Sequence, residues 1–464
     1  MATVEELKKE LCYKADNAGA ILSDEEIAKA DAFAEGYKKF LNEAKTEREA
    51  TQVVLSHAKE KGFQEFVPGK KYEAGDKLYY VNRDKAIILA VIGKKGIDEG
   101  VKIAAAHIDS PRLDLKPNPL YESDEIALFK THYYGGIKKY QWVAIPLALH
   151  GVIVKKDGTK VTVKIGEEEC EPKFVISDIL PHLGAEQGKR TLSEGISGEE
   201  LNVIVGSRPF KSDEGSELVK LNILKHLNEK YGIVESDFLS AELEVVPAFK
   251  ADDIGFDRSL IGSYGHDDRV CAYPAAMAAF DVEAPDYTVI SVLTDKEETG
   301  SDGNTGLQSS YLKYFIAYLA KANELEVYQV LSKSECLSAD VNSAYDPTFN
   351  SVFEKNNTSY LNKGVVITKY TGARGKSGTS DASAEYMGKI RAMLDKANVV
   401  WQIGELGKVD AGGGGTVAKY IANLDIDVVD LGVPVLSMHA PYEVISKLDL
   451  YMAYKAFYAI YKSS

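Results

Sequence analysis

At 464 residues, the chain is too long for one ordinary hydrophobic core, so two domains, or one large domain with an insertion, are expected. Its formal net charge of −15 argues against a nucleic-acid partner, because the binding of phosphates requires clustered Lys and Arg. Its apolar runs are shorter than the roughly 20 residues that cross a bilayer, and its charged N-terminus differs from a signal peptide, so we expect neither a membrane span nor export.

The N-terminal part of the sequence predicts helices followed by buried strands. Ser23 and Glu26 have the spacing of a capping box, and apolar residues recur at helical spacing as far as Leu41, so the first sixty residues are expected to be helical. The apolar runs 86–92 and 101–106 predict strands in the middle of a sheet that is covered on both faces.

The block 116–247 has a different character, because it is rich in β-type residues and turns. Two alternating runs flank Asp157 and Gly158 and predict a hairpin over residues 152–163. Residues 184–200 are polar and glycine-rich and predict an exposed loop. Since candidate functional residues lie on both sides of the block, we interpret it as an inserted β-rich domain.

After residue 248, apolar strand patterns alternate with helical patterns. Strands are expected at 287–293, 326–331, 364–368 and 398–403, and helices at 306–323, 380–396 and 442–464. This alternation predicts an α/β fold with a mainly parallel sheet and helices on both faces. The catalytic domain would then be discontinuous and comprise residues 1–115 and 248–464.

Side chains that bind metal ions stand at the ends of several apolar runs. Taken singly, a histidine or an acidic pair at such a position is usually structural. In a parallel sheet, however, the carboxyl ends of the strands meet at one edge, so these side chains are expected to converge. The set is His107, Asp267, Glu298, Asp340 and His439.

The chemistry of this set favours two divalent cations. Imidazoles and carboxylates suit Zn²⁺, with Co²⁺ or Mn²⁺ as alternatives, and Asp267 is the best candidate to bridge the two ions. Three carboxylates and one hydroxide would balance the charge of two such cations. The four cysteines have neither the spacing of a thiolate zinc site nor that of a disulfide framework, and this favours a reducing, cytoplasmic location.

Two further acidic residues are expected to act beside the metal ligands. Glu297 precedes Glu298 on a predicted bend, where it can stay free of the metal and act as the general base for a metal-activated water. Asp109 lies two residues after His107 and can fix the orientation of that imidazole. Asp268 either supports Asp267 in a similar way or pairs with Arg269.

Over essentially its whole length, the chain resembles the aspartyl aminopeptidase and aminopeptidase I family of dinuclear zinc metallopeptidases. The resemblance rests on the motifs Ala-Ala-His107-Ile-Asp109-Ser-Pro, Tyr-Gly-His-Asp267-Asp-Arg, Glu297-Glu298-Thr-Gly-Ser, Ser-Ala-Asp340 and Ser-Met-His439-Ala. It implies that His107 and His439 each hold one zinc, that Asp267 bridges, that Glu298 and Asp340 complete the two sites, and that Glu297 is the base.

The resemblance also implies a homo-oligomer, a tetrahedral dodecamer in which the inserted domain takes part in assembly. In the family, a histidine of that domain reaches the active site of a neighbouring subunit, and His182 is the matching position; a partly buried loop histidine is the alternative interpretation. The Gly-His-Asp267-Asp-Arg motif and the segment 371–381 are more similar to the aminopeptidase I branch. The preferred N-terminal residue, acidic or neutral, stays open, since Arg374 or Lys376 could bind a substrate carboxylate.

The sequence therefore predicts a cytoplasmic metal-dependent aminopeptidase that removes single N-terminal residues from peptides. A related two-metal carboxypeptidase or deacylase is the alternative enzyme, because it would use the same metal ligands. A different class is an assembly or shell protein that keeps the metals only for stability.

Overall fold

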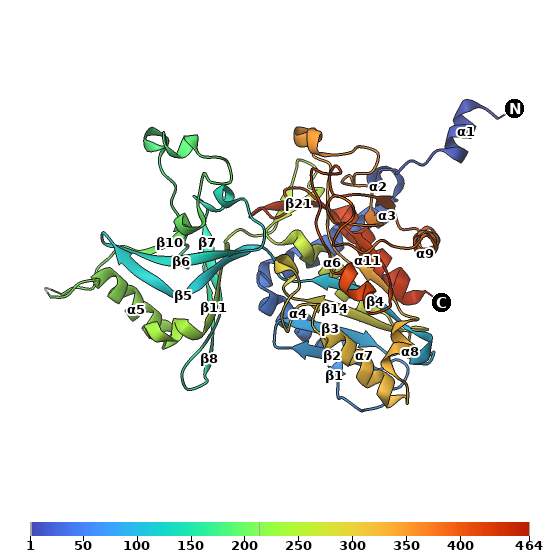
Figure 1. Ribbon diagram of the computed structural model, residues 1–464, viewed down its shortest axis with the longest axis horizontal. Helices are drawn as coiled ribbons and strands as arrows, with labels where there is room; N and C mark the ends of the chain where they lie inside the picture. The colour runs from blue at the N-terminus through green and yellow to red at the C-terminus, as the bar shows by residue number, and fades with distance from the viewer. Residues whose placement is uncertain (1, 213, 464) are drawn as a thin grey trace.

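Two sheets form the framework of two lobes in the computed structural model, which describes residues 2–212 and 214–463 (Figure 1). The larger lobe contains a nine-stranded sheet with the order β1-β2-β3-β14-β4-β15-β19-β17-β18. Its strands are β1 (Gln64–Glu65), β2 (Lys77–Asn82), β3 (Ala86–Val91), β4 (Val101–His107), β14 (Thr288–Thr294), β15 (Glu335–Ser338), β17 (Val365–Thr368), β18 (Trp401–Ile403) and β19 (Asp427–Gly432). None of the helices in the described ranges has the length and apolar character of a membrane span.

The nine-stranded sheet is mixed, whereas the sequence analysis expected a mainly parallel one. Parallel pairing runs through its centre, from β14 through β4 and β15 to β19. The flanking strands β3 and β17 run antiparallel to β14 and β19. The pair β2–β3 is antiparallel as well, because Arg83 and Asp84 form a tight turn between the two strands, with φ of 54° and 58°.

Helices cover both faces of this sheet, as its buried strands require. In β3, Ile87 and Leu89 belong to the core on one face, while Ile88 and Ala90 belong to the core on the other. The first face is covered by α3 (Asp24–Glu43), α4 (Glu47–Glu60), α6 (His266–Asp281), α9 (Ala384–Lys396) and α11 (Lys447–Lys462). The second is covered by α7 (Tyr311–Ala322), α8 (Val327–Leu331) and α10 (Ala418–Ala422).

Several predicted elements are confirmed, and two are corrected. Ser23 caps α3 by accepting a hydrogen bond from the Glu26 N–H at 3.2 Å. The predicted strand 326–331 is wrong, because this segment forms α8, where Gln329 accepts the Glu326 N–H at 2.8 Å; the strand that leads to Asp340 is β15. The predicted C-terminal helix starts later, at Lys447, since β21 (Glu443–Ser446) first pairs with β13 (Leu260–Ser263).

The smaller lobe contains a seven-stranded antiparallel sheet with the order β8-β7-β11-β5-β6-β10-β9. The predicted hairpin is confirmed as the pair β7–β8, and Gly158 takes a φ of +85° in its turn. Between β9 and β10 the chain extends away from the sheet in short, exposed turns (Figure 1). The elements of this lobe are β5 (Arg112–Ser123), β6 (Ile126–Tyr134), β7 (Leu147–Val154), β8 (Lys160–Ile165), β9 (Val175–Ile176), β10 (Asn202–Gly206), α5 (Leu218–Tyr231) and β11 (Ala241–Pro247).

A buried network of charged groups joins the two lobes. Lys45, between α3 and α4, places its Nζ 2.7 Å from Glu167 Oε1 in the smaller lobe. His150 of β7 lies between the two lobes, with Nε2 3.0 Å from Glu167 and Nδ1 2.9 Å from Glu49. Burial lowers the pKa of Lys45 to about 8. Because each of these charges has a partner, the network holds the lobes in one arrangement.

The remaining short elements are α1 (Val4–Leu11), α2 (Ala18–Ile21), β12 (Asp252–Ile254), β16 (Asn342–Ser343) and β20 (Pro434–Val435). With α3 and α4, the helices α1 and α2 confirm the helical expectation for the N-terminal sixty residues. Helix α1 extends from the larger lobe, away from the rest of the chain (Figure 1).

Candidate metal centre

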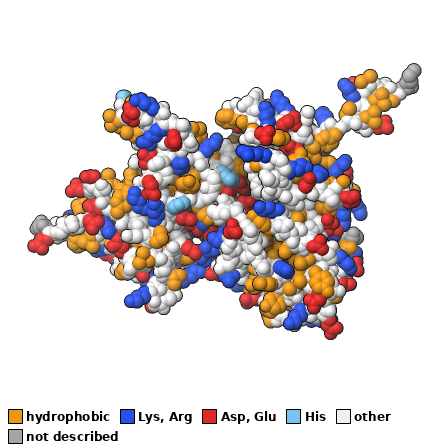
Figure 2. Space-filling view, viewed as in Figure 1, with side chains coloured by type: hydrophobic (Ala, Val, Ile, Leu, Met, Phe, Trp, Pro, Cys, Tyr) orange, Lys and Arg blue, Asp and Glu red, His pale blue; other side chains and the backbone are white. Residues whose placement is uncertain are grey.

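The candidate metal ligands converge where the parallel strands of the large sheet end. His107 is the last residue of β4, and its partner in β14 is Thr294, three residues before Glu297. Asp340 follows β15, the neighbour of β4 on the other side. Asp267 lies in the first turn of α6, and His439 lies between β20 and β21. Figure 2 shows histidine and acidic side chains in the hollow between the two lobes.

Asp267 lies between the two imidazoles and directs one carboxylate oxygen to each. Its Oδ1 is 3.1 Å from His107 Nε2, and its Oδ2 is 3.1 Å from His439 Nε2. On the other side of each ring, Nδ1 donates to a backbone carbonyl, that of Asp109 at 3.0 Å and that of Gly136 at 2.7 Å. With Nδ1 held in this way, each Nε2 faces a carboxylate oxygen, and either a proton on Nε2 or a cation between the two groups can satisfy this contact.

Two further carboxylates, Glu298 and Asp340, add negative charge around the two imidazoles. Glu298 Oε2 is 3.5 Å from His439 Nε2, and Asp340 Oδ1 is 4.0 Å from His107 Nε2. Burial raises the pKa of Glu298 and that of Asp340 well above the usual range. Glu298 Oε1 is buried and has no hydrogen-bond partner among the described residues. Crowded carboxylates with an orphaned oxygen fit divalent cations.

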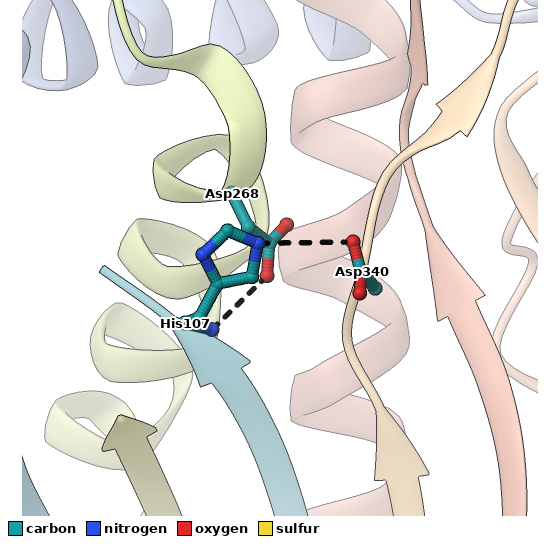
Figure 3. Close-up of side chains that lie close together, drawn as sticks. All are labelled: His107, Asp268 and Asp340. Carbon is teal, nitrogen blue, oxygen red and sulfur yellow. Dashed lines mark hydrogen bonds and ion pairs between the residues drawn. The ribbon is translucent and has the colours of Figure 1, made fainter. Parts of the chain in front are cut away.

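Ligand atoms gather in two groups that share His107. One group contains His107, Asp267 and Glu298, the other His107, Asp268 and Asp340, and within each group the candidate ligand atoms lie within 4.8 Å of one another. Figure 3 shows the second group, in which His107 from β4, Asp268 from α6 and Asp340 after β15 point toward one another. Burial lowers the pKa of His439, but without a bound cation the hydrogen bond to Asp267 and the charge of Glu298 outweigh it and raise this pKa to about 10.

Asp109 shapes the bend that carries Glu297 and Glu298. Its Oδ1 accepts the Glu297 N–H and its Oδ2 accepts the Glu298 N–H, both at 3.2 Å, and Tyr134 donates to Oδ2 at 2.8 Å. Lys296, with a φ of +68°, starts the bend. Asp109 Oδ1 also lies 3.2 Å from His107 Nδ1, so the same carboxylate contacts both the imidazole and the Glu-Glu pair.

Glu297 stands apart from the contacts that hold the other carboxylates. Its Oε2 is 3.9 Å from His107 Nε2, and its side chain lines the cavity beside the cluster. Burial raises the pKa of Glu297 to about 7. A carboxylate in this position can exchange a proton with a group in the cavity.

The sequence alone does not reveal Glu443 as a site residue, and it leaves the role of Asp268 open. Glu443 is buried, and its Oε2 accepts the Asp267 N–H at 3.1 Å while its Oε1 accepts the His439 N–H at 2.7 Å. Asp268 Oδ2 accepts the His107 N–H at 3.3 Å. The one signal in the sequence for Glu443 is its position four residues after His439 and just before the final helix.

A cavity of about 450 Å³ opens beside the cluster. Besides the candidate ligands, it is lined by polar and small residues, including Asn342, Thr368, Gly413, Gly414, Gly415, Thr416, Lys419 and Asp430. Arg374 and Lys376 line a separate, smaller cavity, and Lys376 pairs with Asp381 at 2.8 Å, so the cation that reaches the main cavity is Lys419. That cavity is large enough for an amino-acid side chain and a short piece of backbone.

His182 lies apart from this site within one chain. It belongs to an exposed turn, Pro181–Leu183, in the extension between β9 and β10. Within the described residues, no hydrogen bond or ion pair joins it to the cluster.

Comparison with known proteins adds independent information. The model of the family described as aminopeptidase I zinc metalloprotease (M18) matches residues 40–461. A probable M18 family aminopeptidase 1 of Clostridium acetobutylicum is 48% identical over 453 residues, which cover 96% of this chain and 97% of the relative. One of Thermotoga maritima is 47% identical over 436 residues, which cover 92% of this chain and 95% of the relative.

Solved structures agree with this result. The crystal structure of an M18 family aminopeptidase from Thermotoga maritima superimposes with a TM-score of 0.93 at 43% identity and covers 97% of this chain and 100% of its own. Aminopeptidase I from Clostridium acetobutylicum gives a TM-score of 0.92 at 46% identity, with 98% and 100% covered. The mApe1 dodecamer of yeast shares the fold, with a TM-score of 0.76 at 20% identity and 94% and 97% covered.

Proposed function

Because the chain belongs to the aminopeptidase I zinc metalloprotease (M18) family and is a metal-dependent aminopeptidase, we propose that its cluster holds two divalent cations, with Zn²⁺ as the native pair. The single observation that carries this proposal is Asp267, which directs one oxygen to each of two imidazoles at 3.1 Å. A carboxylate shared in this way is typical of two-metal sites. Co²⁺ and Mn²⁺ suit the same donors.

The remaining donors divide between the two imidazoles. Asp340 is on the side of His107, and Glu298 is on the side of His439. In this assignment Asp267 is shared, so each cation has one imidazole and two carboxylates from the protein. Asp268 and Glu443 would hold the ligands in place through backbone N–H groups.

Bound cations of this kind polarise the scissile carbonyl and lower the pKa of a water molecule toward neutrality. Glu297 is the residue that moves protons in our proposal. It accepts a proton from the attacking water and later donates it to the amine that leaves. Asp109 keeps Glu297 and Glu298 on the same bend, so that one carboxylate serves as base while its neighbour serves as ligand.

We infer that the cavity beside the cluster receives the N-terminal residue of a peptide. Gly413, Gly414 and Gly415 expose backbone along its wall, and this would allow a peptide backbone to approach closely. Asp430 and Lys419 place opposite charges on the lining, so both acidic and neutral residues remain candidates for the preferred side chain.

The proposal is tested with matched substrates and one variant. A free-amine peptide should be cleaved and its N-acetylated twin should not, whereas a deacylase or carboxypeptidase would also act on the blocked peptide. Glu297→Gln should reduce kcat by orders of magnitude while metal analysis still finds two ions per chain. One ion per chain, or hydrolysis unchanged in the variant, would overturn the assignment.

We further propose that the protein is a homo-oligomer, a tetrahedral dodecamer, in which residues 116–247 form an inserted assembly domain. The exposed extension between β9 and β10 supports this proposal, because it gives His182 a position from which it can reach a neighbouring subunit. Light scattering measures the mass of the particle. His182→Ala should lower kcat/KM without changing that mass. The four free thiols fit a cytoplasmic location.

A further inference from the structure

The N-terminal helix α1 presents an apolar stripe that the described residues leave largely uncovered. Val4, Leu7 and Leu11 lie on one face of the helix and are 68%, 43% and 73% exposed, and none of its residues is buried. A capping box nevertheless closes its first turn, with Thr3 Oγ1 accepting the Glu6 N–H at 3.2 Å. An isolated helix of eight residues is marginal in water, so its stability must come from packing against another surface.

A groove between α9 and α11 offers a surface of matching character. It has a volume of about 580 Å³, and its apolar lining includes Met393, Tyr454 and Tyr458. Four lysines border it, although the chain as a whole carries a net charge of −15: Lys389, Lys396, Lys455 and Lys462. Lys389 pairs with Glu335 and Lys455 with Glu26, whereas no ion pair occupies the other two lysines within the described ranges.

The charges of α1 complement those of the groove. Lys8 lies beside Val4 on one side of the apolar stripe, and on the other side Glu6 and Glu10, spaced i and i+4, form an acidic row in which Glu6 Oε2 accepts the Thr3 N–H at 2.7 Å. When Leu7 and Leu11 face the lining of the groove, this row can lie against its lysine border. The stripe thus matches the groove in polarity, and Glu10 at its acidic edge can pair with a lysine of the border.

The path of the N-terminal segment indicates which groove α1 fills, that of its own chain or that of a second copy. The Tyr13 ring stacks on Trp401 with centroids 6.0 Å apart, and Trp401 donates to Asp395 of α9 at 2.7 Å. The N-terminal segment therefore leaves the body beside the end of α9, and α1 then extends outward (Figure 1). A twofold axis near this point would bring each α1 to the groove of the other copy, as a reciprocal exchange of identical elements.

We propose that α1 of one copy docks its Val4–Leu7–Leu11 stripe in the α9–α11 groove of a second copy of this chain. The contact is independent of peptide hydrolysis, and it rests on the homo-oligomeric state proposed above.

Natural Cys12, at the end of α1, allows a direct test by crosslinking. One chain carries Cys170→Ser and keeps Cys12, and a co-expressed, tagged chain carries Cys12→Ser, Cys170→Ser and Ala392→Cys in the groove. A short bis-maleimide should join the two chains into a heterodimer of distinct mass. With Lys321→Cys on the distant helix α7 in place of Ala392→Cys, no heterodimer is expected.

Two variants of α1 separate the stripe from the rest of the helix. Leu7→Asp should reduce the crosslinked fraction at least tenfold, whereas the matched Lys9→Asp, on the opposite face, should leave it unchanged. Equal loss in both variants would overturn the proposed face.

The remaining outcomes also decide the proposal. In a chain that carries both Cys12 and Ala392→Cys, a crosslink that leaves the mass of a single chain would show that α1 fills its own groove and would overturn the exchange. Absence of a crosslink in a sample that light scattering finds oligomeric would overturn the docking and leave the proposed assembly standing. A monomer by light scattering would remove both.

Discussion

Replacing Glu443 by glutamine removes one of two hydrogen bonds that hold the backbone of the proposed metal ligands Asp267 and His439. Glu443 accepts the N–H of Asp267 at 3.1 Å and that of His439 at 2.7 Å. Glutamine has the same shape but a single acceptor oxygen, so its amide N–H₂ group must face one of these two N–H donors. Because His439 has a φ of +65°, we expect its loop to shift when this anchor is lost.

The size of the effect follows from the number of donors left without a partner. One buried N–H without an acceptor costs about 1–3 kcal/mol. Each 1.4 kcal/mol is a factor of about ten, so metal affinity should fall about 5- to 150-fold. At saturating metal, kcat should recover most of its value, since Glu443 touches neither the cavity nor Glu297.

Competition with a chelator measures the metal affinity, and denaturant unfolding of the metal-free protein measures stability. Asp449→Asn is the matched control, because this buried carboxylate also accepts two backbone N–H groups, those of Asn362 and Gly364, both at 2.7 Å. The control should lose a similar amount of stability and keep its metal affinity. If Glu443→Gln also keeps its metal affinity, Glu443 supports only the fold and our reasoning is refuted.

Three further perturbations have defined outcomes. Asp109→Asn should lower kcat about tenfold or more with both ions bound, because it loosens the bend that carries Glu297 and Glu298, and an unchanged kcat would contradict that role. Lys45→Met should reduce the free energy of unfolding by about 1.5–3 kcal/mol, since the buried Glu167 loses one of its two lysine partners and keeps Lys250 at 2.8 Å. Adding Glu167→Gln should restore part of this loss, and additive losses in denaturant unfolding would argue against coupling. Removal of metal by a chelator should abolish hydrolysis and lower Tm, and Zn²⁺ should restore both, whereas an unchanged Tm would indicate a cluster that is stable without ions.

Many strands and turns could be predicted, because each is marked by residues that are close together in the sequence. The buried strands β3, β4 and β14 appear in the sequence as mostly apolar runs, since helices cover both of their faces. The turn at Asp157 and Gly158 marks the β7–β8 hairpin for a similarly local reason. The segment 326–331 shows the limit of this approach, because six residues with four apolar ones among them have the same pattern in a short helix and in a strand.

The candidate ligands could be named from the sequence because each lies near the end or start of a recognisable element. Their supporting residues could not be named, because the partners are distant in the chain. Glu443 and Asp267 are 176 positions apart, and Asp268 and His107 are 161 positions apart. No local pattern encodes such pairs, and only the folded chain brings them into contact.

By itself, the sequence determined the candidate metal-binding residues and the ends of the apolar runs on which they stand, because residue type and hydrophobic period are local properties. The tertiary structure decided the rest: the direction of the outer strands, the sharing of Asp267 between two imidazoles, and the buried carboxylates behind them. These features depend on how elements far apart in the chain pack together. Hydrogen bonds and charges can be matched only after that packing is complete.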